Sequence, residues 1–205
     1  MQYAQTISAI SIKAPLAAIK TNSDEALVEA IAAGDRRAMQ VLFGRHQVKV
    51  YRFLVRMTGD TAAADDLVSE VFFEVWRKAA SFEGRSQVST WLLGIARFKA
   101  LSAARRRTED QLSELAAETI EDESDDPETA LGKQDTAAII RQCLQQLSAD
   151  HREILDLVYY HEKSVDEVAA VVGIPSGTVK TRMFYARKRM AELLKDAGID
   201  QTAWA

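Results

Sequence analysis

SVDEVAAVVGIPSGTVKTRMFYARKRMAELL (Ser164–Leu194) predicts two helices joined by a tight turn, and this stretch decides the fold of the C-terminal part of the chain. Ser164 and Glu167 match the S-x-x-E pattern of a capping box, which marks the start of the first helix. Apolar residues then recur at the i, i+3, i+4, i+7 spacing of one helical face: Val165, Val168, Ala169 and Val172. Gly173 can adopt a positive φ and end this helix, and Ser176 is expected to cap the second one.

The second helix of this stretch has an outward face that suits a DNA major groove. At about 100° per residue, one face is apolar and the opposite face carries mixed side chains: Gly177, Thr181, Phe184, Tyr185 and Lys188. Cations flank that face on both sides: Lys180, Arg187, Arg182 and Arg189. Outward residues would meet base edges while the cations meet the two phosphate walls. The alternative is an ordinary helical hairpin whose basic face is solvated.

Length and composition indicate a folded protein of one or two domains. The chain has 205 residues, 47% of them hydrophobic, with three prolines and nine glycines, which disfavours an all-β fold. The net charge of −4 taken alone argues against a nucleic-acid partner. However, residues 1–107 carry 16 Lys and Arg against 10 acids, and residues 108–133 carry ten acids and one lysine. Local charge decides affinity for DNA, so the overall balance does not exclude it.

Cysteine usage and the N-terminus exclude several classes of protein. The single cysteine excludes an internal disulfide framework and disfavours a structural zinc site. Without a Cys/His cluster at metal spacing, the sequence predicts no metal and no cofactor. The N-terminus lacks a basic leader, and Lys13 and Pro15 interrupt any apolar run, which indicates neither a signal peptide nor a spanning helix. We therefore expect a soluble, cytoplasmic protein with no membrane insertion and a disordered tail at residues 1–22.

Residues 23–79 predict a series of amphipathic helices. We expect a short helix from Ser23, a longer one ending at Gly59, and a third over about residues 62–79. The outward face of the third helix places an aromatic residue among charged ones: Asp66, Ser69, Glu70, Phe73 and Arg77. Exposed aromatic residues often anchor interfaces, so this face is a candidate partner surface. The alternative is that Phe73 packs beneath a loop. No nucleophile, metal ligand or phosphate loop lies near these acids, which argues against catalysis.

A polar loop and a basic helix follow. The loop, residues 80–89, contains Phe82 and Arg85, and the helix combines an apolar stripe that includes Trp91 and Phe98 with a terminal arginine triplet, residues 105–107. Aromatic rings beside arginines could stack unpaired bases and hold their backbone. Equally, the rings could be core residues and the arginines a favourable charge at a helix C-terminus.

Residues 108–133 predict a flexible acidic linker, because they contain Pro127 and show weak periodicity. After them, apolar residues recur at helical spacing, so Cys143 is expected to be a small buried residue. Of the three histidines, His46 lies in an apolar stripe and is expected to be partly buried, whereas His151 and His161 are expected at the surface or at helix ends.

Three segments together resemble the extracytoplasmic function (ECF) sigma factors, members of the sigma-70 family reduced to regions 2 and 4. The segments are ADDLVSEVFFEVWR (residues 64–77), FEG…STWLLGIAR (residues 82–97) and LSADHREILDLVYYHEKSVDEVAAVVGIPSGTVKTRMFYARKRM (residues 147–190). The resemblance implies an all-α fold of two small helical domains. Region 2 would span residues 23–107 and region 4 residues 134–197, joined by the flexible acidic linker at 108–133.

The resemblance also implies a function without enzymatic activity. Such a protein joins core RNA polymerase, recognises the −35 promoter element as duplex and helps melt the −10 element. Its implied partners are the clamp coiled coil of the largest polymerase subunit, the flap of the second-largest subunit, promoter DNA and an anti-sigma factor.

Three sets of residues are carried over on these motifs. The polymerase-binding set is Asp66, Ser69, Glu70, Phe73 and Arg77. The −10 set is Phe82, Arg85, Ser86, Gln87, Trp91, Arg97, Arg105 and Arg106. The −35 set is Ser176, Thr178, Lys180, Thr181, Arg182, Phe184, Tyr185, Arg187 and Lys188.

The chain departs from the family pattern at two of these places. Phe98 follows the Ile-Ala-Arg run where the family often has a polar Asn, which predicts a different −10 preference. Tyr185 stands where a basic residue is frequent, so an apolar or hydroxyl contact replaces a phosphate contact there. Two alternatives belong to other classes: a helix-turn-helix regulator that is not a polymerase subunit, and a protein-binding helical bundle without a DNA role. Neither gives a purpose to the Phe73 face together with the arginine triplet.

Overall fold

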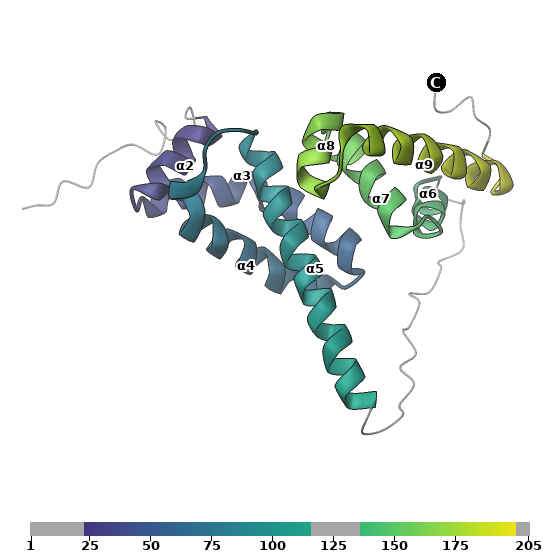
Figure 1. Cartoon of the computed structure of the whole chain (residues 1–205), viewed down its shortest axis with the longest axis horizontal. Helices are drawn as coiled ribbons and strands as arrows, with labels where there is room; N and C mark the ends of the chain where they lie inside the picture. The colour runs from purple at the N-terminus through teal and green to yellow at the C-terminus, as the bar shows by residue number, and fades with distance from the viewer. Residues whose placement is uncertain (1–22, 116–135, 200–205) are drawn as a thin grey trace, which may run out of the picture.

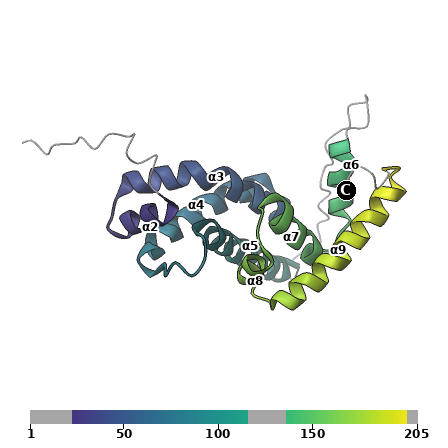
Figure 2. The same cartoon turned by 90° about the horizontal axis from the view of Figure 1, so that it is seen from above.

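The computed structural model describes residues 23–115 and 136–199, and every regular element in these two ranges is a helix. The first range forms an N-terminal unit and the second a C-terminal unit, and the two units lie side by side (Figure 1; Figure 2). The predicted all-α fold of two helical units is therefore confirmed. The predicted N-terminal tail and residues 116–133 of the predicted linker lie outside the described residues.

The helices follow one another in a simple order. The N-terminal unit comprises α2 (Asp24–Ala32), α3 (Arg36–Thr58), α4 (Thr61–Lys78), the short 3₁₀ turn η1 (Ala79–Ser81) and α5 (Val88–Leu115). The C-terminal unit comprises α6 (Thr136–Gln145), α7 (Ala149–Leu155), the π-helical turn η2 (Asp156–Tyr160), α8 (Val165–Val172) and α9 (Ser176–Asp196). Helix α5 continues past residue 107 into the stretch predicted to be linker, and its C-terminal half projects away from both units (Figure 1). None of these helices is long and apolar enough to cross a membrane.

Short polar side chains begin the helices of the N-terminal unit. The Ser23 hydroxyl accepts the N–H of Ala26 at 3.2 Å at the start of α2. Asp60 accepts two N–H groups at the start of α4, at 2.9 and 3.1 Å. Gly59, with φ 72°, ends α3 in the left-handed conformation that glycine adopts without a Cβ clash. These caps fix the corner between α3 and α4 where the sequence predicts it.

The capping box predicted at the start of α8 is present. The Ser164 hydroxyl accepts the Glu167 N–H at 3.3 Å, and the Glu167 carboxylate accepts the Ser164 N–H at 3.0 Å. Gly173 ends the helix with φ 75°, as predicted. The turn between the two helices therefore has the geometry of a helix-turn-helix.

The expectation that Ser176 caps α9 is wrong. Pro175 precedes the helix in extended conformation, and Ser176 is the first helical residue. Its hydroxyl donates to the Asp166 carboxylate at 2.7 Å, which ties the start of α9 back to α8. Because a hydroxyl one residue inside the helix cannot reach the usual capping partner, it binds the neighbouring helix instead.

One hydrophobic core crosses both units. Buried side chains of α2 to α5 form a contiguous cluster with buried side chains of the C-terminal unit: Ile154, Leu157, Val168, Val171, Val172 and Val179. A smaller core lies between α6, α7 and α9, and Cys143 is buried in it as predicted. The helix-turn-helix is therefore held partly by apolar residues of the N-terminal unit.

Histidine contacts connect helices in two places. His46 is partly buried, as expected, and its Nε2 lies 2.6 Å from the Asp24 carboxylate. Burial would raise the pKa of Asp24, but hydrogen bonds from Arg45 and His46 outweigh it and hold that pKa below its usual value. His161 lies at the C-terminal end of η2, one of its two expected positions, and its ring is buried and packs edge-on against Phe53 at 5.5 Å.

Helix α3 and the turn η2 also share charged groups. Arg56 Nε lies 2.5 Å from the Asp156 carboxylate, and the same guanidinium lies 3.9 Å from the centre of the Tyr160 ring. His161 Nε2 lies 3.4 Å from the second oxygen of Asp156. Nearly all of the Asp156 side chain is buried. Moving the two units apart would break its ion pair with Arg56, so this contact favours the described arrangement.

Leu157→Ala tests the shared core. Leu157 is fully buried in η2, so we expect the free energy of unfolding to fall by about 2–5 kcal/mol. Urea unfolding followed by circular dichroism measures this loss, and the wild type should unfold in a single transition because the core is continuous. Tyr159→Ala, at an exposed neighbouring position, is the control and should change stability by less than about 0.5 kcal/mol. Two separate transitions, with the substitution moving one of them, would contradict a shared core.

Candidate nucleic-acid interface

The outward face of α4 exposes an aromatic ring among polar and charged side chains. Phe73 is 62% exposed, and the Arg77 guanidinium lies 6.0 Å from its ring centre. No loop of residues 23–115 or 136–199 buries Phe73, so the alternative that it packs beneath one is wrong. Glu70 accepts from Lys99 at 3.0 Å, while the other predicted members of this face, Asp66 and Ser69, are exposed. The arrangement is that of an aromatic anchor with a polar rim.

The loop before α5 places its aromatic residue against the helix. The rings of Phe82 and Trp91 lie 4.9 Å apart, and Trp91 is half-buried. Arg85 extends into solvent and pairs with Glu83. Ser86 and Trp91 line a groove of about 280 Å³ between α4, α5 and α8. Its walls mix aromatic with polar groups.

Phe98 borders this groove and departs from the predicted apolar stripe. Its side chain is 67% exposed, whereas other apolar side chains of α5 are buried: Val88, Leu92, Leu93, Ala96 and Ala100. The buried face of α5 is therefore rotated about the helix axis from the predicted apolar stripe. Phe98 therefore presents a ring to solvent beside Trp91 and Ile95 on the groove wall.

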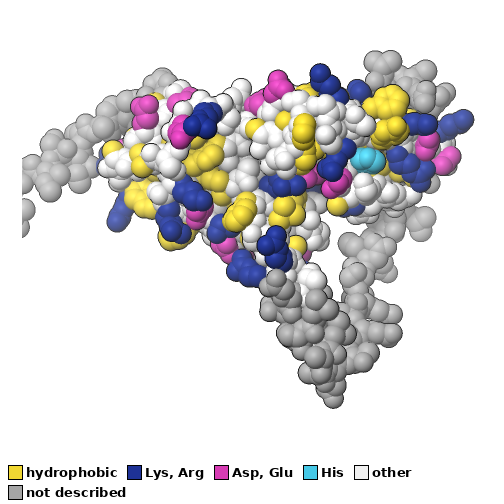
Figure 3. All heavy atoms as spheres, viewed as in Figure 1, with side chains coloured by type: hydrophobic (Ala, Val, Ile, Leu, Met, Phe, Trp, Pro, Cys, Tyr) yellow, Lys and Arg dark blue, Asp and Glu magenta, His cyan; other side chains and the backbone are white. Residues whose placement is uncertain are grey.

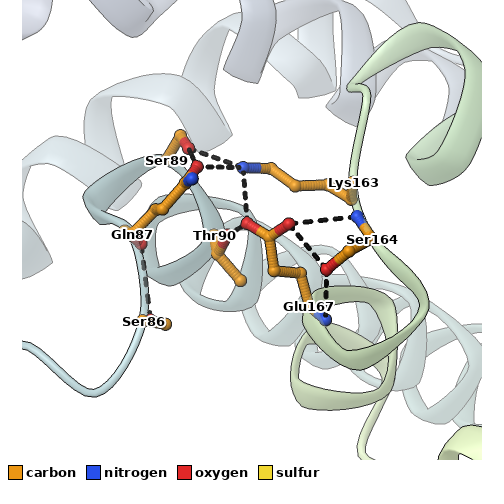
Figure 4. A network of polar contacts seen from close by, with 7 residues as sticks. All are labelled: Ser86, Gln87, Ser89, Thr90, Lys163, Ser164 and Glu167. Atoms are coloured by element: carbon orange, nitrogen blue, oxygen red, sulfur yellow. Dashed lines mark hydrogen bonds and ion pairs between the residues drawn. The ribbon is translucent and has the colours of Figure 1, made fainter.

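A polar network joins the loop and α5 to the start of α8 (Figure 4). The Lys163 ammonium donates to Ser89 Oγ at 2.6 Å and to Gln87 Oε1 at 3.3 Å. It also pairs with Glu167 at 3.2 Å, and the Thr90 hydroxyl donates to the same carboxylate oxygen at 2.6 Å. Glu167 thus caps α8 and binds the N-terminal unit at once.

These contacts lower the pKa of Glu167 to about 2 from its usual 4.5. Burial of the carboxylate would raise the pKa, but it is outweighed by hydrogen bonds from Thr90, from the N–H and hydroxyl of Ser164 and from Lys163. The carboxylate is therefore ionised at neutral pH, and its charge is matched within the network.

A second ionic contact crosses between the units at Arg97. Its Nε and Nη2 donate to the two oxygens of Glu153 at 2.7 and 3.4 Å, a bidentate pair with both side chains mostly buried. Two further predicted −10 residues, Arg105 and Arg106, are exposed on the projecting half of α5. Arg97 is thus occupied by a carboxylate of the C-terminal unit, while the arginine triplet is open to solvent.

Sequence reasoning missed Glu153 and Lys163, and treated Glu167 as a helix cap alone. Glu153 and Lys163 contact the predicted −10 residues Arg97 and Gln87. Glu167 contacts Thr90, and more than 50 positions separate the two residues of each pair in the chain. The capping-box pattern was the one available signal, and it pointed to local structure. Among the residues that the structure describes, no group of His, Cys, Asp and Glu could hold a metal ion.

The outward face of α9 is open, and its predicted members lie where the helical spacing places them. Phe184 and Tyr185 are 59% and 54% exposed, and their rings meet edge to face at 5.4 Å. Figure 3 shows hydrophobic and basic side chains gathered over α9. Three cations of the face are exposed and form no ion pair within the described part of the chain: Lys180, Arg187 and Lys188. Thr178 and Thr181 are also exposed, and Ser176 is partly covered by its contact with α8.

Arg182 differs from the other cations of α9. Its guanidinium pairs with Asp150 of α7 at 2.9 Å and is directed away from the outward face. Thr181 donates its hydroxyl to the Gly177 carbonyl at 3.1 Å. The face therefore combines an exposed aromatic pair and Lys188 with cations along its border, which suits a polyanion with apolar features in its groove.

The chain is similar to proteins of known function over nearly its whole length. Family models of sigma-70 region 2 and sigma-70 region 4 match residues 42–109 and 137–190. The RNA polymerase sigma-H factor of Pseudomonas aeruginosa is 34% identical over 189 residues, covering 85% of this chain and 97% of that protein. The ECF RNA polymerase sigma factor SigL of Mycobacterium tuberculosis is 30% identical over 179 residues, covering 85% and 98%. The solved sigma factor RpoE of Bartonella quintana, in complex with the anti-sigma factor NepR, matches with a TM-score of 0.60 and 30% identity, over 76% of this chain and 96% of that one.

The lowered pKa of Glu167 predicts how stability depends on pH. Because the pKa is lower in the folded state, the stabilisation is fully present above about pH 4.5 and is lost as the pH falls toward 2. We expect Glu167→Gln to be less stable than the wild type at neutral pH, with a difference that shrinks between about pH 5 and pH 3. Denaturant unfolding at a series of pH values measures it. Glu29→Gln, at an exposed position of α2, is the control; a Glu167→Gln difference that does not change with pH would contradict the assignment.

Proposed function

Because the chain belongs to the ECF subfamily of the sigma-70 family of RNA polymerase sigma factors, we propose that it binds core RNA polymerase and directs initiation at specific promoters. Sigma factors are polymerase subunits and not enzymes. The observation that carries the proposal is the joint presence of a region 2 unit with an exposed aromatic face and a region 4 unit with an open basic helix face. The protein would act in the cytoplasm, where its polymerase is.

The Phe73 face of α4 is the proposed polymerase contact. An exposed aromatic ring beside an arginine and flanked by carboxylates has the composition of an interface centre. We assign this face to the clamp coiled coil of the largest subunit, and the C-terminal unit to the flap of the second-largest subunit. The mixed charge around Phe73 supports a protein partner over DNA, since nearby carboxylates would repel phosphates.

The groove beside Trp91 is the proposed site for the melted −10 strand. Stacking of a base on an aromatic side chain is worth about 1–3 kcal/mol, enough to offset much of the loss of stacking in the duplex. Trp91 and Phe98 supply rings at the groove, while Arg105 and Arg106 are open cations farther along α5. Phe98 has no amide to pair with a base edge, so it favours stacking over hydrogen-bonded reading.

Helix α9 is the proposed reader of the −35 duplex. Its open face has cations on its border, and they would lie along the phosphate walls of a major groove. The pairing of Arg182 with Asp150 suits a cation placed at the edge of the interface. Lys180, Arg187 and Lys188 are then the main sources of sequence-independent attraction.

We call the described arrangement of the two units the closed arrangement. It must open before the protein can bind the −35 and −10 elements at the same time. The −35 and −10 elements lie about 25 base pairs apart, which is roughly 85 Å at 3.4 Å per pair. In the closed arrangement Lys163 of the C-terminal unit lies 2.6 Å from Ser89 beside the −10 groove. The two units therefore cannot occupy both elements while these contacts hold. Opening would also release Arg97 from Glu153 for the −10 strand.

An anti-sigma factor is the proposed regulator. The similar structure of RpoE is a complex with the anti-sigma factor NepR. A partner that binds both units would stabilise the closed arrangement in proportion to its preference for that state.

Run-off transcription with purified core polymerase tests the function. The chain should direct initiation from a subset of a promoter library, which core polymerase alone should not transcribe specifically. A helix-turn-helix regulator would bind DNA without core polymerase yet give no initiation with it, and that outcome would overturn the proposal.

Two aromatic substitutions should separate polymerase binding through α4 from DNA binding through α9. Phe73→Ala should weaken binding to core polymerase by about 1–3 kcal/mol, the range for an aromatic anchor, and leave thermal stability unchanged because the ring is exposed. Phe184→Ala removes a ring of similar exposure from α9 and should leave core binding unchanged. Fluorescence anisotropy with labelled protein measures both. Equal core affinity for the wild type and Phe73→Ala would remove the α4 assignment.

Glu153→Ala should favour the open arrangement. Removing Glu153 leaves Arg97 without its carboxylate in the closed form, whereas in the open form the guanidinium is solvated. If the closed arrangement competes with binding to core polymerase, the apparent affinity of Glu153→Ala for core polymerase should be about fivefold higher than that of the wild type, the equivalent of about 1 kcal/mol. Glu192→Ala, which breaks a pair within α9, is the control and should have no effect. Unchanged core affinity for Glu153→Ala would mean that the closed form does not compete.

A further inference from the structure

The outward face of α9 carries few side chains that could read purines by paired hydrogen bonds. Arg and Lys can bind guanine in this way, and Asn and Gln can bind adenine. Within α9, Arg182 is paired with Asp150, Arg189 is paired with Glu192, and Arg187 lies at the border of the face. Apart from Lys188, which could bind a guanine edge, the outward face therefore offers little for the hydrogen-bonding edge of a purine.

The outward face of α9 also presents exposed aromatic surface. Phe184 and Tyr185 are both more than half exposed and lie against each other. The hydroxyl of Thr181 is turned to the helix's own backbone. In the major groove the apolar feature that distinguishes one base from the others is the 5-methyl group of thymine, and apolar side chains contact it.

We propose that Phe184 and Tyr185 read thymine 5-methyl groups in the −35 duplex. The proposal rests on the function assigned to α9 above and goes beyond it by naming the chemical feature that is recognised. The ring centres are 5.4 Å apart, between one and two base-pair steps of about 3.4 Å. The two rings therefore reach thymines at neighbouring or next-but-one base pairs, and the cations on the border fix the helix between the phosphates.

The test uses the full chain assembled with core polymerase. Selection from a library randomised over the −35 region gives the preferred duplex, which should contain thymines, on either strand, one or two steps apart. Each thymine is then replaced by deoxyuridine, which pairs identically and lacks the methyl group. Because burying one methyl group is worth about 0.8 kcal/mol, each of the two replacements should weaken binding about fourfold. Replacements elsewhere in the duplex should have no effect.

Substitutions assign the effect to the two rings. Phe184→Ser and Tyr185→Ser should each abolish the discrimination between thymine and deoxyuridine at one position and keep it at the other. Tyr185→Phe should retain discrimination at both positions. Tyr159→Ser, which removes a ring of similar exposure from η2, outside α9, is the matched control and should discriminate like the wild type.

The outcomes separate this inference from the proposed function. Specific initiation with equal affinity for thymine and deoxyuridine at every −35 position would overturn the methyl-reading inference and leave the sigma-factor assignment standing. Discrimination that survives in the Phe184→Ser, Tyr185→Ser double variant would also overturn it. If the assembled polymerase selects no −35 sequence, the function proposed for α9 fails, and the inference fails with it.

Discussion

The arrangement of this molecule depends on the Glu167 carboxylate, because this group takes part both in the capping box of α8 and in the contact between the two units. Within α8 it completes the capping box with Ser164, so it helps to define where the helix-turn-helix begins. Across the contact between the units it accepts from Thr90. It also pairs with Lys163 of its own unit, which in turn donates to Ser89 of the N-terminal unit. A change that neutralises it therefore weakens a local helix start and a long-range contact together. The helix-turn-helix and its position against α5 are coupled through one side chain.

The contact between the units combines an apolar core with charged pairs at its edges. Apolar burial supplies most of the attraction, but it is non-directional. The pairs Arg97–Glu153 and Arg56–Asp156 add direction, because a small displacement would leave a buried charge without its partner. Such pairs contribute little net stability compared with apolar residues of similar size. They favour one alignment while the units are together, and their charges are readily hydrated once the units are apart.

Local features of the fold could be predicted from the sequence, and contacts between distant segments could not. The capping box at Ser164, the positive φ of Gly173 and the exposed rings of α9 all follow from short-range spacing and are present. The burial of His161 could not be predicted, because the side chain against which it packs, Phe53, is more than a hundred residues away in the chain. The sequence likewise contains many carboxylates that could pair with Arg97, and nothing in it selects Glu153. The exposed residues of α9 thus lie on the face that helical spacing predicts, while the contacts of Arg97 and Gln87 with the C-terminal unit were not foreseen.

In the closed arrangement one of the two proposed DNA-binding faces is accessible and the other is obstructed. The proposed function therefore has an order, in which duplex binding through α9 precedes binding of the melted strand. The outward face of α9 is open, with its aromatic pair and three unpaired cations accessible within the described part of the chain. The −10 groove is bordered by Ala170 of α8, and Arg97 is held by Glu153. A closed chain could therefore meet duplex DNA through α9 but could not hold a melted strand. In the proposed function melting is the costly step, and the contacts proposed for the melted strand become available only when the units separate. Since core polymerase is the partner proposed to separate them, the protein by itself would bind duplex without opening it.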